Sequence, residues 1–155
     1  MIFVTVGSLH FPFYRLIGAL PALPLEEVVV QHGPATPPPG VRRAIPFMPF
    51  SELVECMEAA DVVITHAGVG SILCAMRVGH TPVAVPRLER YGEAVDDHQV
   101  RLVKALGELE RVRAVLDMRD LPRAVVEAPA RGAPAERNER PIHVAVRAAL
   151  RGQAP

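Results

Sequence analysis

Three polar segments contain residue types that could bind a negatively charged ligand. The first is Gly7 with Ser8, where glycine permits close backbone approach and serine offers a hydroxyl. The second is the turn 66–71, and the third is the polar segment 87–99. Each follows a short apolar run that is typical of a buried strand, so their positions depend on how those strands are arranged. At Gly7 and Ser8, a plain turn is the alternative to a phosphate contact.

The turn 66–71 has the sequence His-Ala-Gly-Val-Gly-Ser and lies between an apolar strand and a helix. Gly68 and Gly70 leave backbone N–H groups free at the start of that helix, where the helix macrodipole favours an anion. His66 adds an imidazole, and Ser71 can either cap the helix or contact a phosphate oxygen. These residues predict a phosphate site, with a simple glycine turn and helix cap as the alternative.

The segment 87–99 ends in a group suited to reading the hydroxyls of a sugar. Asp97, His98 and Gln99 place an acceptor, a titratable imidazole and an amide at the start of one helix. The alternative is that Asp96 or Asp97 only caps the helix, with solvated neighbours.

Apolar residues between a short strand and a helix offer a place for a flat base. Phe47 and Met48, with Phe50 close by, could flank a nucleobase through apolar and sulfur–aromatic contacts. Packing in the core is the alternative for all three. Cys56 lies on a helix whose other face is charged, and we interpret it as a core residue rather than a nucleophile.

Known nucleotide and metal fingerprints are absent from the sequence. A dinucleotide site requires G-x-G-x-x-G/A, but Leu73 occupies the third position, and Arg87 follows the next strand where a ribose-binding acid is expected. This disfavours an NAD-binding domain. No G-x-x-x-x-G-K-[S/T] segment exists, which excludes a P-loop ATPase. The histidines are scattered without paired ligand spacing, so we predict no metal and no cofactor.

The composition fits one globular domain. The chain has 155 residues, 50% of them hydrophobic and 22% charged, which excludes disorder of the whole chain. A formal net charge of +0 provides no overall basic field, so we predict no nucleic-acid partner. The cysteines lack C-x-x-C spacing, which indicates a reducing compartment, and no apolar run reaches the length of a membrane span. We therefore expect a cytoplasmic protein.

Apolar strand patterns alternate with helical patterns. Strands are expected at 2–6, 28–31, 44–47, 61–65, 81–85 and 112–116, and helices at 13–20, 51–60, 71–78, 98–109 and 120–127. Ser51 and Asp120 are expected to cap their helices, and Gly79 to end the helix 71–78. The alternation predicts an α/β fold with a Rossmann-like, mainly parallel sheet and helices on both faces. All three polar segments then lie at the carboxyl edge of the sheet.

Two regions are expected along the chain. A ligand-binding domain occupies 1–128, and a tail rich in Pro, Ala and Arg occupies 129–155, with a short helix at 142–150. The loop 34–40 includes consecutive prolines and is expected to be extended on the surface. This loop and the tail are candidate contact regions for a partner.

Four segments together resemble the glycosyltransferase family 28 C-terminal-domain family. They are 1–8, 60–73, 85–87 and 92–99. The resemblance runs in consistent order from Met1 to about Leu121. It is greatest to stand-alone subunits of the bacterial exopolysaccharide (PssE) type. It extends to the catalytic subunit of the dolichol-pathway UDP-GlcNAc transferase and, more distantly, to the C-terminal half of MurG.

The resemblance implies the C-terminal half of a GT-B glycosyltransferase, which binds a UDP-sugar as donor without a cofactor. It implies that the diphosphate faces Gly7, Ser8, His66, Gly68, Gly70 and Ser71. It implies that the ribose or the transferred sugar faces Glu93, Asp97, His98 and Gln99.

One departure from the family concerns the ribose. Many relatives carry an acidic residue that contacts the ribose where this chain has Cys74, and its absence favours the exopolysaccharide branch. That branch is linked with glucuronate transfer. We therefore expect the Arg87 guanidinium to pair with the carboxylate of a sugar such as glucuronate.

The implied function is that of a donor-binding catalytic subunit in a two-component hexosyltransferase. Its partner would be a membrane-anchored subunit that binds a lipid-linked saccharide and holds this chain at the inner face of the plasma membrane. His10 and His98 are candidates for the general base, which stays unassigned. A non-catalytic, regulatory subunit is the alternative, motivated by Cys74 and by the unassigned base. An unrelated nucleotide-binding module is a third, disfavoured by Leu73 and Arg87.

Overall fold

A computed structural model describes residues 1–132 of the protein. Its strands are β1 (Ile2–Thr5), β2 (Val28–Gln31), β3 (Arg43–Ile45), β4 (Val62–His66), β5 (Val83–Val85) and β6 (Arg113–Ala114). Its α-helices are α1 (Tyr14–Ala19), α2 (Phe50–Ala59), α3 (Val69–Arg77), α4 (His98–Glu108) and α5 (Leu121–Val126). The α/β fold predicted from the sequence is confirmed.

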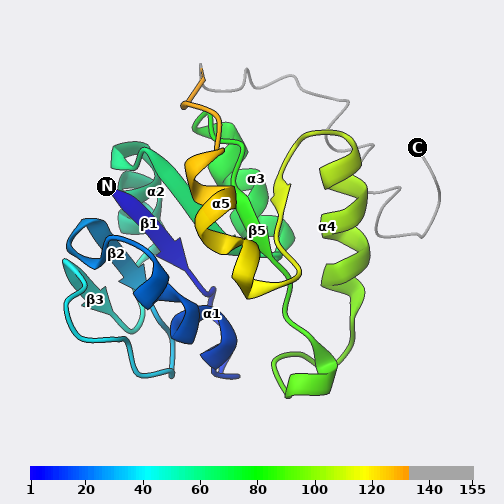
Figure 1. The fold of residues 1–155 in the computed structure, drawn as a ribbon, viewed down its shortest axis with the longest axis horizontal. Coiled ribbons are helices and arrows are strands. Elements are labelled where there is room, and N and C mark those ends of the chain that lie inside the picture. The colour runs from blue at the N-terminus through cyan, green and yellow to red at the C-terminus, as the bar shows by residue number, and fades with distance from the viewer. Residues whose placement is uncertain (133–155) are drawn as a thin grey trace.

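The strands form one 6-stranded parallel sheet in the order β3-β2-β1-β4-β5-β6 (Figure 1). Strand β1 is central, because Phe3 pairs with Val29 of β2 on one side and with Val63 of β4 on the other. The chain extends the sheet first through β2 and β3, and then in the other direction from β4 to β6. Such a reversal is the point where parallel sheets bind ligands, outside the carboxyl ends of the strands.

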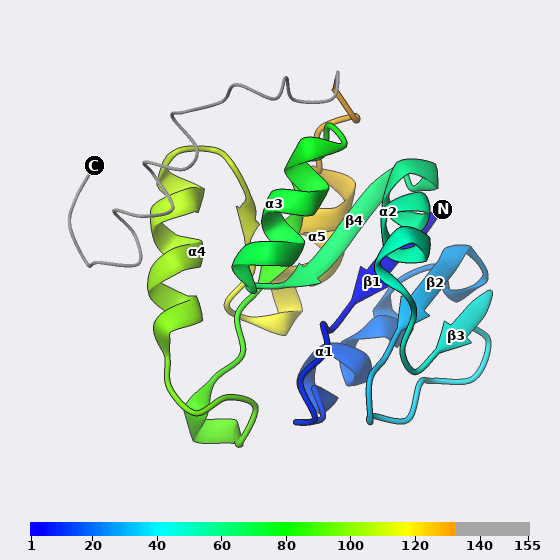
Figure 2. The ribbon, with the colours of Figure 1, turned by 180° about the vertical axis from the view of Figure 1, so that it is seen from behind.

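Helices cover both faces of the sheet, as predicted. Helices α1 and α5 lie on the face toward the viewer in Figure 1, and α2 and α3 lie on the opposite face, seen in Figure 2. Neighbouring residues of β1 point into different layers: Val4 packs in a cluster with Leu16 of α1, and Phe3 packs in a cluster with Met57 of α2. Each of these side chains is 0% exposed. The sheet is therefore a platform buried on both faces, and its carboxyl edge carries the polar segments.

Some predicted helix ends differ from the structure. Helix α2 begins at Phe50 with Pro49 at its N-cap, so Ser51 lies inside the first turn and does not cap it. Asp120 stands at the N-cap of α5 but accepts no capping hydrogen bond, because a 3₁₀ turn leads directly into the helix. Gly79 follows the end of α3 with a φ of +96°, as expected of a glycine that ends a helix.

The chain remains packed beyond residue 128. The Arg131 guanidinium donates to the carbonyls of Glu58 and Val78, and the Gly132 amide donates to the Gly79 carbonyl at 2.9 Å. These contacts lie at the C-terminal ends of α2 and α3, where carbonyls lack partners in their own helix. The boundary expected at 128 stays a prediction, and the helix expected at 142–150 lies outside the described residues.

Candidate functional site

The three polar segments meet at the carboxyl edge of the sheet. Gly7 and Ser8 follow β1, the turn 66–71 leads from β4 into α3, and residues 86–97 link β5 to α4. We name residues 86–97 the strap. Because β1, β4 and β5 are neighbours in the sheet, their carboxyl ends bring these segments together at the switch point.

His66, the last residue of β4, is buried between two glycines. A Cβ atom at Gly7 would lie 2.6 Å from His66 Nε2, and a Cβ atom at Gly68 would lie 2.9 Å from His66 Cδ2. Both distances are far shorter than van der Waals contact. Gly7 also has a φ of +77°, which other residues rarely adopt. The imidazole therefore requires both glycines, independently of any ligand.

Burial keeps the His66 imidazole neutral at physiological pH. Desolvation, with the positive charge of Arg87 as a second cause, lowers the pKa of His66 from 6.5 to about 4. The Nδ1 atom is buried and has no hydrogen-bond partner among residues 1–132. A neutral imidazole thus lies directly before the turn into α3.

Helix α3 begins with unused hydrogen-bond donors. Gly68 is its N-cap, and the Ile72 amide donates to the Gly68 carbonyl at 3.0 Å. The amides of Val69, Gly70 and Ser71 precede that bond and have no partner within the helix. The alternative in which Ser71 caps the helix is wrong, because Ser71 lies inside the first turn of α3 and no side chain within residues 1–132 caps this helix. These amides and the helix dipole form an end that can bind an anion.

A pocket of about 370 Å³ opens at this end of α3. One part of its wall is polar and is formed by Ser8, Gly70 and Ser71, while Leu53 contributes to an apolar part. The full lining consists of Gly7, Ser8, Gln31, Phe47, Met48, Phe50, Leu53, Gly70, Ser71 and Cys74. The pocket combines an anion-binding end with an apolar wall.

The aromatic residues of this wall are exposed. Phe47 is 53% exposed and Phe50 is 71% exposed, so the alternative in which they pack in the core is wrong. Met48 does pack partly against the core cluster beneath α2. Cys74 lines the same pocket, at the place where the resemblance puts an acidic residue in many relatives.

Gln31 is a site residue that the sequence analysis missed. Its Nε2 donates to the Gly7 carbonyl at 3.0 Å and to the Pro46 carbonyl at 2.9 Å, and its Oε1 accepts from the Thr5 hydroxyl at 2.7 Å. Gln31 therefore fixes two sides of the pocket relative to each other. The available signal was a polar residue at the carboxyl end of an otherwise apolar strand.

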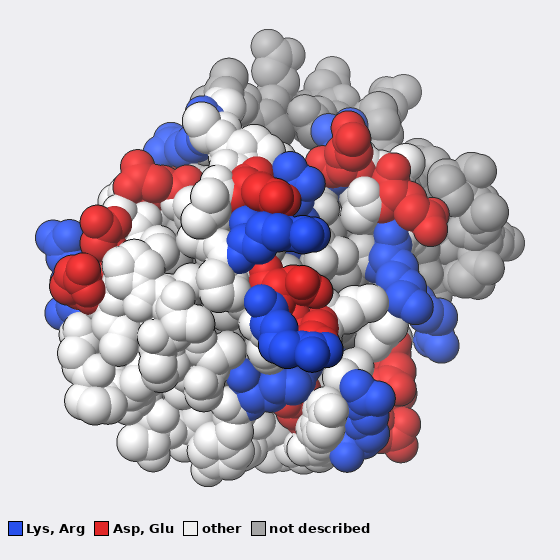
Figure 3. Space-filling view, viewed as in Figure 1, with Lys and Arg blue, Asp and Glu red and all other residues white. Residues whose placement is uncertain are grey.

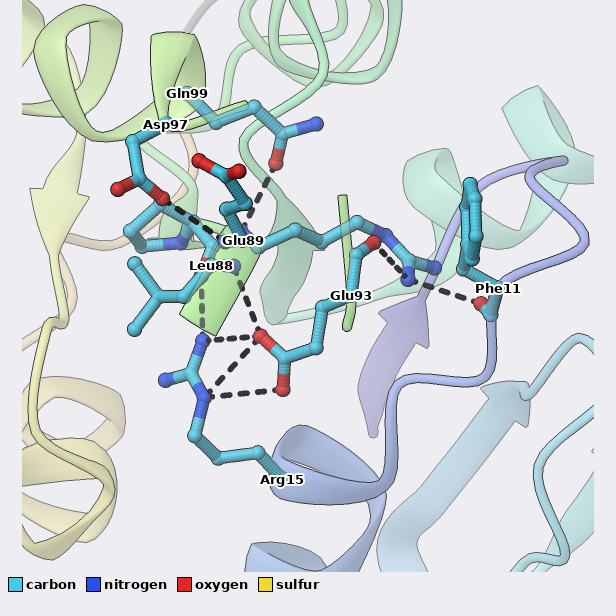
Figure 4. Close-up of polar contacts among 9 residues, drawn as sticks. Phe11, Arg15, Leu88, Glu89, Glu93, Asp97 and Gln99 are labelled. Carbon is cyan, nitrogen blue, oxygen red and sulfur yellow. Dashed lines mark hydrogen bonds and ion pairs between the residues drawn. The ribbon is translucent and has the colours of Figure 1, made fainter. Parts of the chain in front are cut away.

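Arg87 does not face the pocket. Its side chain is 0% exposed, and the guanidinium donates to the Val6 carbonyl at 2.8 Å. It also donates to the carbonyls of Phe11 at 2.9 Å and Glu93 at 3.2 Å (Figure 4). It also lies over the Phe13 ring, at 4.6 Å from the ring centre. The expected pairing with a sugar carboxylate therefore needs correction. In this structure Arg87 ties the strap to the loop after β1.

Glu93 also points inward. It is 3% exposed, and its carboxylate accepts from the Arg15 guanidinium and from the Leu88 amide at 3.0 Å (Figure 4). Glu93 was expected to face a ribose or a sugar, but in this structure its carboxylate is turned inward to Arg15 and the Leu88 amide. Arg15 lies in α1, outside every polar segment, and no pattern in the sequence marked it.

The three residues at the start of α4 are fixed to different degrees. Gln99 is buried, and its Oε1 accepts from the Arg87 amide at 3.0 Å, while Asp97 accepts from the Glu89 amide at 2.9 Å. Asp96 accepts from the His98 amide and contacts the His98 imidazole. The capping alternative thus holds for Asp96, whereas Asp97 braces the strap. The His98 side chain is 48% exposed and stays accessible.

The surface and the described helices add three observations. On the face shown in Figure 3, basic and acidic side chains alternate, so that face carries no field of a single sign. Within residues 1–132, no group of His, Cys, Asp or Glu is arranged to hold a metal ion. Over the same residues, no helix is both long enough and apolar enough to cross a bilayer.

Comparison with protein-family models decides the family. The model described as glycosyltransferase family 28 C-terminal domain matches residues 1–149. This chain belongs to that family. The matched range extends beyond Leu121, where the resemblance seen in the sequence ended. The GT-B-type, Rossmann-like fold of the C-terminal half is therefore confirmed for the chain.

Two known proteins are similar to this family member. The UDP-N-acetylglucosamine transferase subunit ALG13 of Yarrowia lipolytica (strain CLIB 122 / E 150) is 36% identical over 67 residues, which are 43% of this chain and 32% of that protein. The glycotransferase of kitacinnamycin superposes with a TM-score of 0.54 at 24% identity, over 97% of this chain and 37% of that chain. The second likeness concerns the fold alone. The chain spans about a third of the length of each.

Proposed function

We propose that this chain is the donor-binding, catalytic subunit of a two-component glycosyltransferase that uses a UDP-sugar. The pocket of about 370 Å³ is the observation that carries the proposal. Its volume is typical of small-ligand sites, and its two walls differ in chemistry as do the base and the diphosphate of a nucleotide. In this proposal the base lies against Phe47 and Phe50. The diphosphate lies against Ser8, Gly70 and Ser71.

The reaction replaces one bond at the anomeric carbon of the sugar. The bond from that carbon to the diphosphate breaks and a bond to an acceptor hydroxyl forms, through an oxocarbenium-like state. Negative charge grows on the departing diphosphate, and the unused amides of Gly70 and Ser71 are placed to stabilise it. The acceptor proton passes to a general base, for which His98 is exposed at the strap and the partner subunit is the other source.

The proposal includes a partner and an acceptor. The relative from Yarrowia is by name a subunit of a transferase, and we assign this chain a partner as well. That partner is membrane-anchored, presents a lipid-linked saccharide, and holds the chain at the inner face of the plasma membrane during exopolysaccharide or other glycan synthesis. UDP-GlcNAc is the first donor to test. UDP-glucuronate is second, because the buried Arg87 no longer offers a contact for its carboxylate.

Binding of UDP by the full chain tests this proposal. UDP at ~100 times its Kd is expected to stabilise the fold by ~2.7 kcal/mol, seen as a higher Tm. Ser71→Ala should weaken binding about tenfold, because a hydrogen bond to a charged phosphate is lost. His66→Ala should also weaken UDP binding, because the imidazole that packs between Gly7 and Gly68 is removed.

Arg123→Lys, in the exposed ion pair of α5, is the matched control and should leave UDP binding unchanged. The proposal fails if neither the chain nor its complex with the partner binds UDP.

A non-catalytic subunit is the second candidate function. Cys74 in the pocket favours it, since this thiol replaces a carboxylate that would contact a ribose. Turnover of the reconstituted complex separates the two candidates. A catalytic subunit loses turnover when Ser71, which lines the pocket, is replaced by alanine, whereas a regulatory subunit does not.

A further inference from the structure

A buried ion pair between Arg15 and Glu93 joins α1 to the strap (Figure 4). Arg15 Nε lies 3.2 and 3.3 Å from the two carboxylate oxygens of Glu93, and Arg15 Nη2 lies 3.0 Å from one of them. Nη2 also donates to the Pro86 carbonyl at 2.5 Å. The two side chains are only 16% and 4% exposed. Arg15 therefore holds the strap at its first residue and again at Glu93.

The strap carries this restraint to the start of α4. The Glu93 carboxylate accepts the Leu88 amide, and the Glu93 amide donates to the Leu88 carbonyl at 3.2 Å, which closes the middle of the strap. The next residue, Glu89, donates its amide to Asp97 at 2.9 Å. The position of Glu93 is thus linked through two hydrogen-bonded steps to the residue that precedes His98.

Arg15 differs from the other buried arginine of the site. Arg87 contacts backbone carbonyls, which the fold of the strap and the first loop already constrain. Arg15 grips a carboxylate with two of its nitrogens, a geometry that lysine cannot reproduce. The Phe13 ring lies near both, with its centre 5.4 Å from the Arg15 guanidinium and 4.6 Å from that of Arg87. The geometry of the Arg15–Glu93 ion pair therefore fixes the orientation of Glu93 within the strap.

We propose that Arg15 is a positioning residue that sets the preference of this site for a UDP-sugar over free UDP. The residues that line the nucleotide pocket lie outside the strap. Asp97 and Gln99 are engaged by the strap, so we assign to the sugar the exposed His98, which directly follows the strap. Loosening the strap therefore displaces His98 from the sugar and leaves the pocket for UDP in place. This inference rests on the proposed function.

Calorimetric titration of the full chain tests this inference. UDP, UDP-GlcNAc, UDP-glucose and UDP-glucuronate are each titrated into wild type, Arg15→Lys, Glu93→Gln and the double variant. Arg15→Lys keeps the positive charge, and Glu93→Gln keeps the shape, so both are chosen to preserve folding, which Tm verifies. Arg123→Lys, which alters an exposed Arg–Glu pair at 3.7 Å, is the matched control.

We expect Arg15→Lys to lower the affinity for the preferred UDP-sugar about tenfold while the affinity for UDP changes by no more than about twofold. Glu93→Gln should have the same effect, and the double variant should lose no more than either single variant, because both remove one interaction. Equal losses for UDP and UDP-sugar, or a lower Tm with an unchanged affinity ratio, would make Arg15 merely structural and overturn the inference. If wild type binds UDP but no ratio changes, only this inference fails. If wild type binds no UDP, the proposed function fails with it.

Discussion

The pocket and the strap use similar polar residues in opposite ways. In the pocket, Ser8 and Gly70 are exposed and the first amides of α3 are unused. The buried frame consists of His66, Arg87, Glu93 and Gln99. Arg87, Glu93 and Gln99 bond to one another or to backbone, and His66 packs between Gly7 and Gly68. The sequence segments that resemble the family include both the pocket residues and the residues of the buried frame. The difference separates residues that can meet a ligand from residues that hold them in position.

The largest effect expected from the buried frame is a loss of stability in acid. His66 has a pKa of about 4 when folded against 6.5 ordinarily, so between these values the unfolded chain binds a proton that the folded chain does not. The contribution of the neutral His66 imidazole to the free energy of unfolding is complete above pH 6.5 and is lost as pH falls toward 4. The loss amounts to about 3 kcal/mol.

Urea unfolding across this pH range measures the effect in wild type and in His66→Gln. The variant should show a flatter dependence of the unfolding free energy on pH. The slope that remains in the variant includes His80, whose pKa burial also lowers. Equal slopes in the two proteins would remove His66 from the buried frame.

The two glycines of the turn 66–71 give the next largest contrast. Gly68→Ala should destabilise the fold by about 1–3 kcal/mol, because the new methyl group overlaps the His66 ring. A Cβ atom at Gly70 would meet nothing within 4 Å, so Gly70→Ala should leave the free energy of unfolding nearly unchanged and weaken UDP binding. Thermal melting and UDP titration of both variants provide the measurement. Unfolding of Gly70→Ala, or an unchanged stability of Gly68→Ala, would show that the two glycines do not have these different roles.

The cysteines offer a smaller and more local test. Cys74 lines the pocket, whereas Cys56 lines a separate groove between β3 and α2, and burial raises the pKa of both thiols. UDP at ~10 times its Kd should slow alkylation of Cys74 about tenfold, because the occupied pocket excludes the reagent. The rate at Cys56 should not change. Mass spectrometry of the labelled protein resolves the two sites, and equal rates at Cys74 with and without UDP would place the nucleotide elsewhere.

The sequence predicted the platform better than the roles of the residues on it. Strand and helix patterns depend on local hydrophobic periodicity, which is why the parallel order and the two covered faces could be anticipated. The positions of Gly7, His66 and Gly68 at one sheet edge followed from the same topology. Their packing did not, because the His66 imidazole also packs against Gly7, which comes from a distant part of the chain.

The strap shows the same limit for charged residues. Arg87 and Glu93 stand beside other polar residues in the sequence, and nothing in that neighbourhood distinguishes a ligand contact from a buried bond. Their partners are Val6, Phe11 and Arg15, from a loop and a helix near the N-terminus. Only the fold brings these together, so a residue type at a predicted site is insufficient to assign its role.

In our proposal, UDP binds in the open pocket while the buried frame keeps its bonds. Titration of the isotope-labelled full chain with UDP, followed by the NMR shifts of its backbone amides, distinguishes the two regions residue by residue. We expect saturable shifts at Ser8, Gly70 and Ser71. The amides of Leu88 and Glu89, already bonded to Glu93 and Asp97, should change little. Shifts concentrated at the strap, or at the Arg42 and Arg43 groove instead of the pocket, would contradict it.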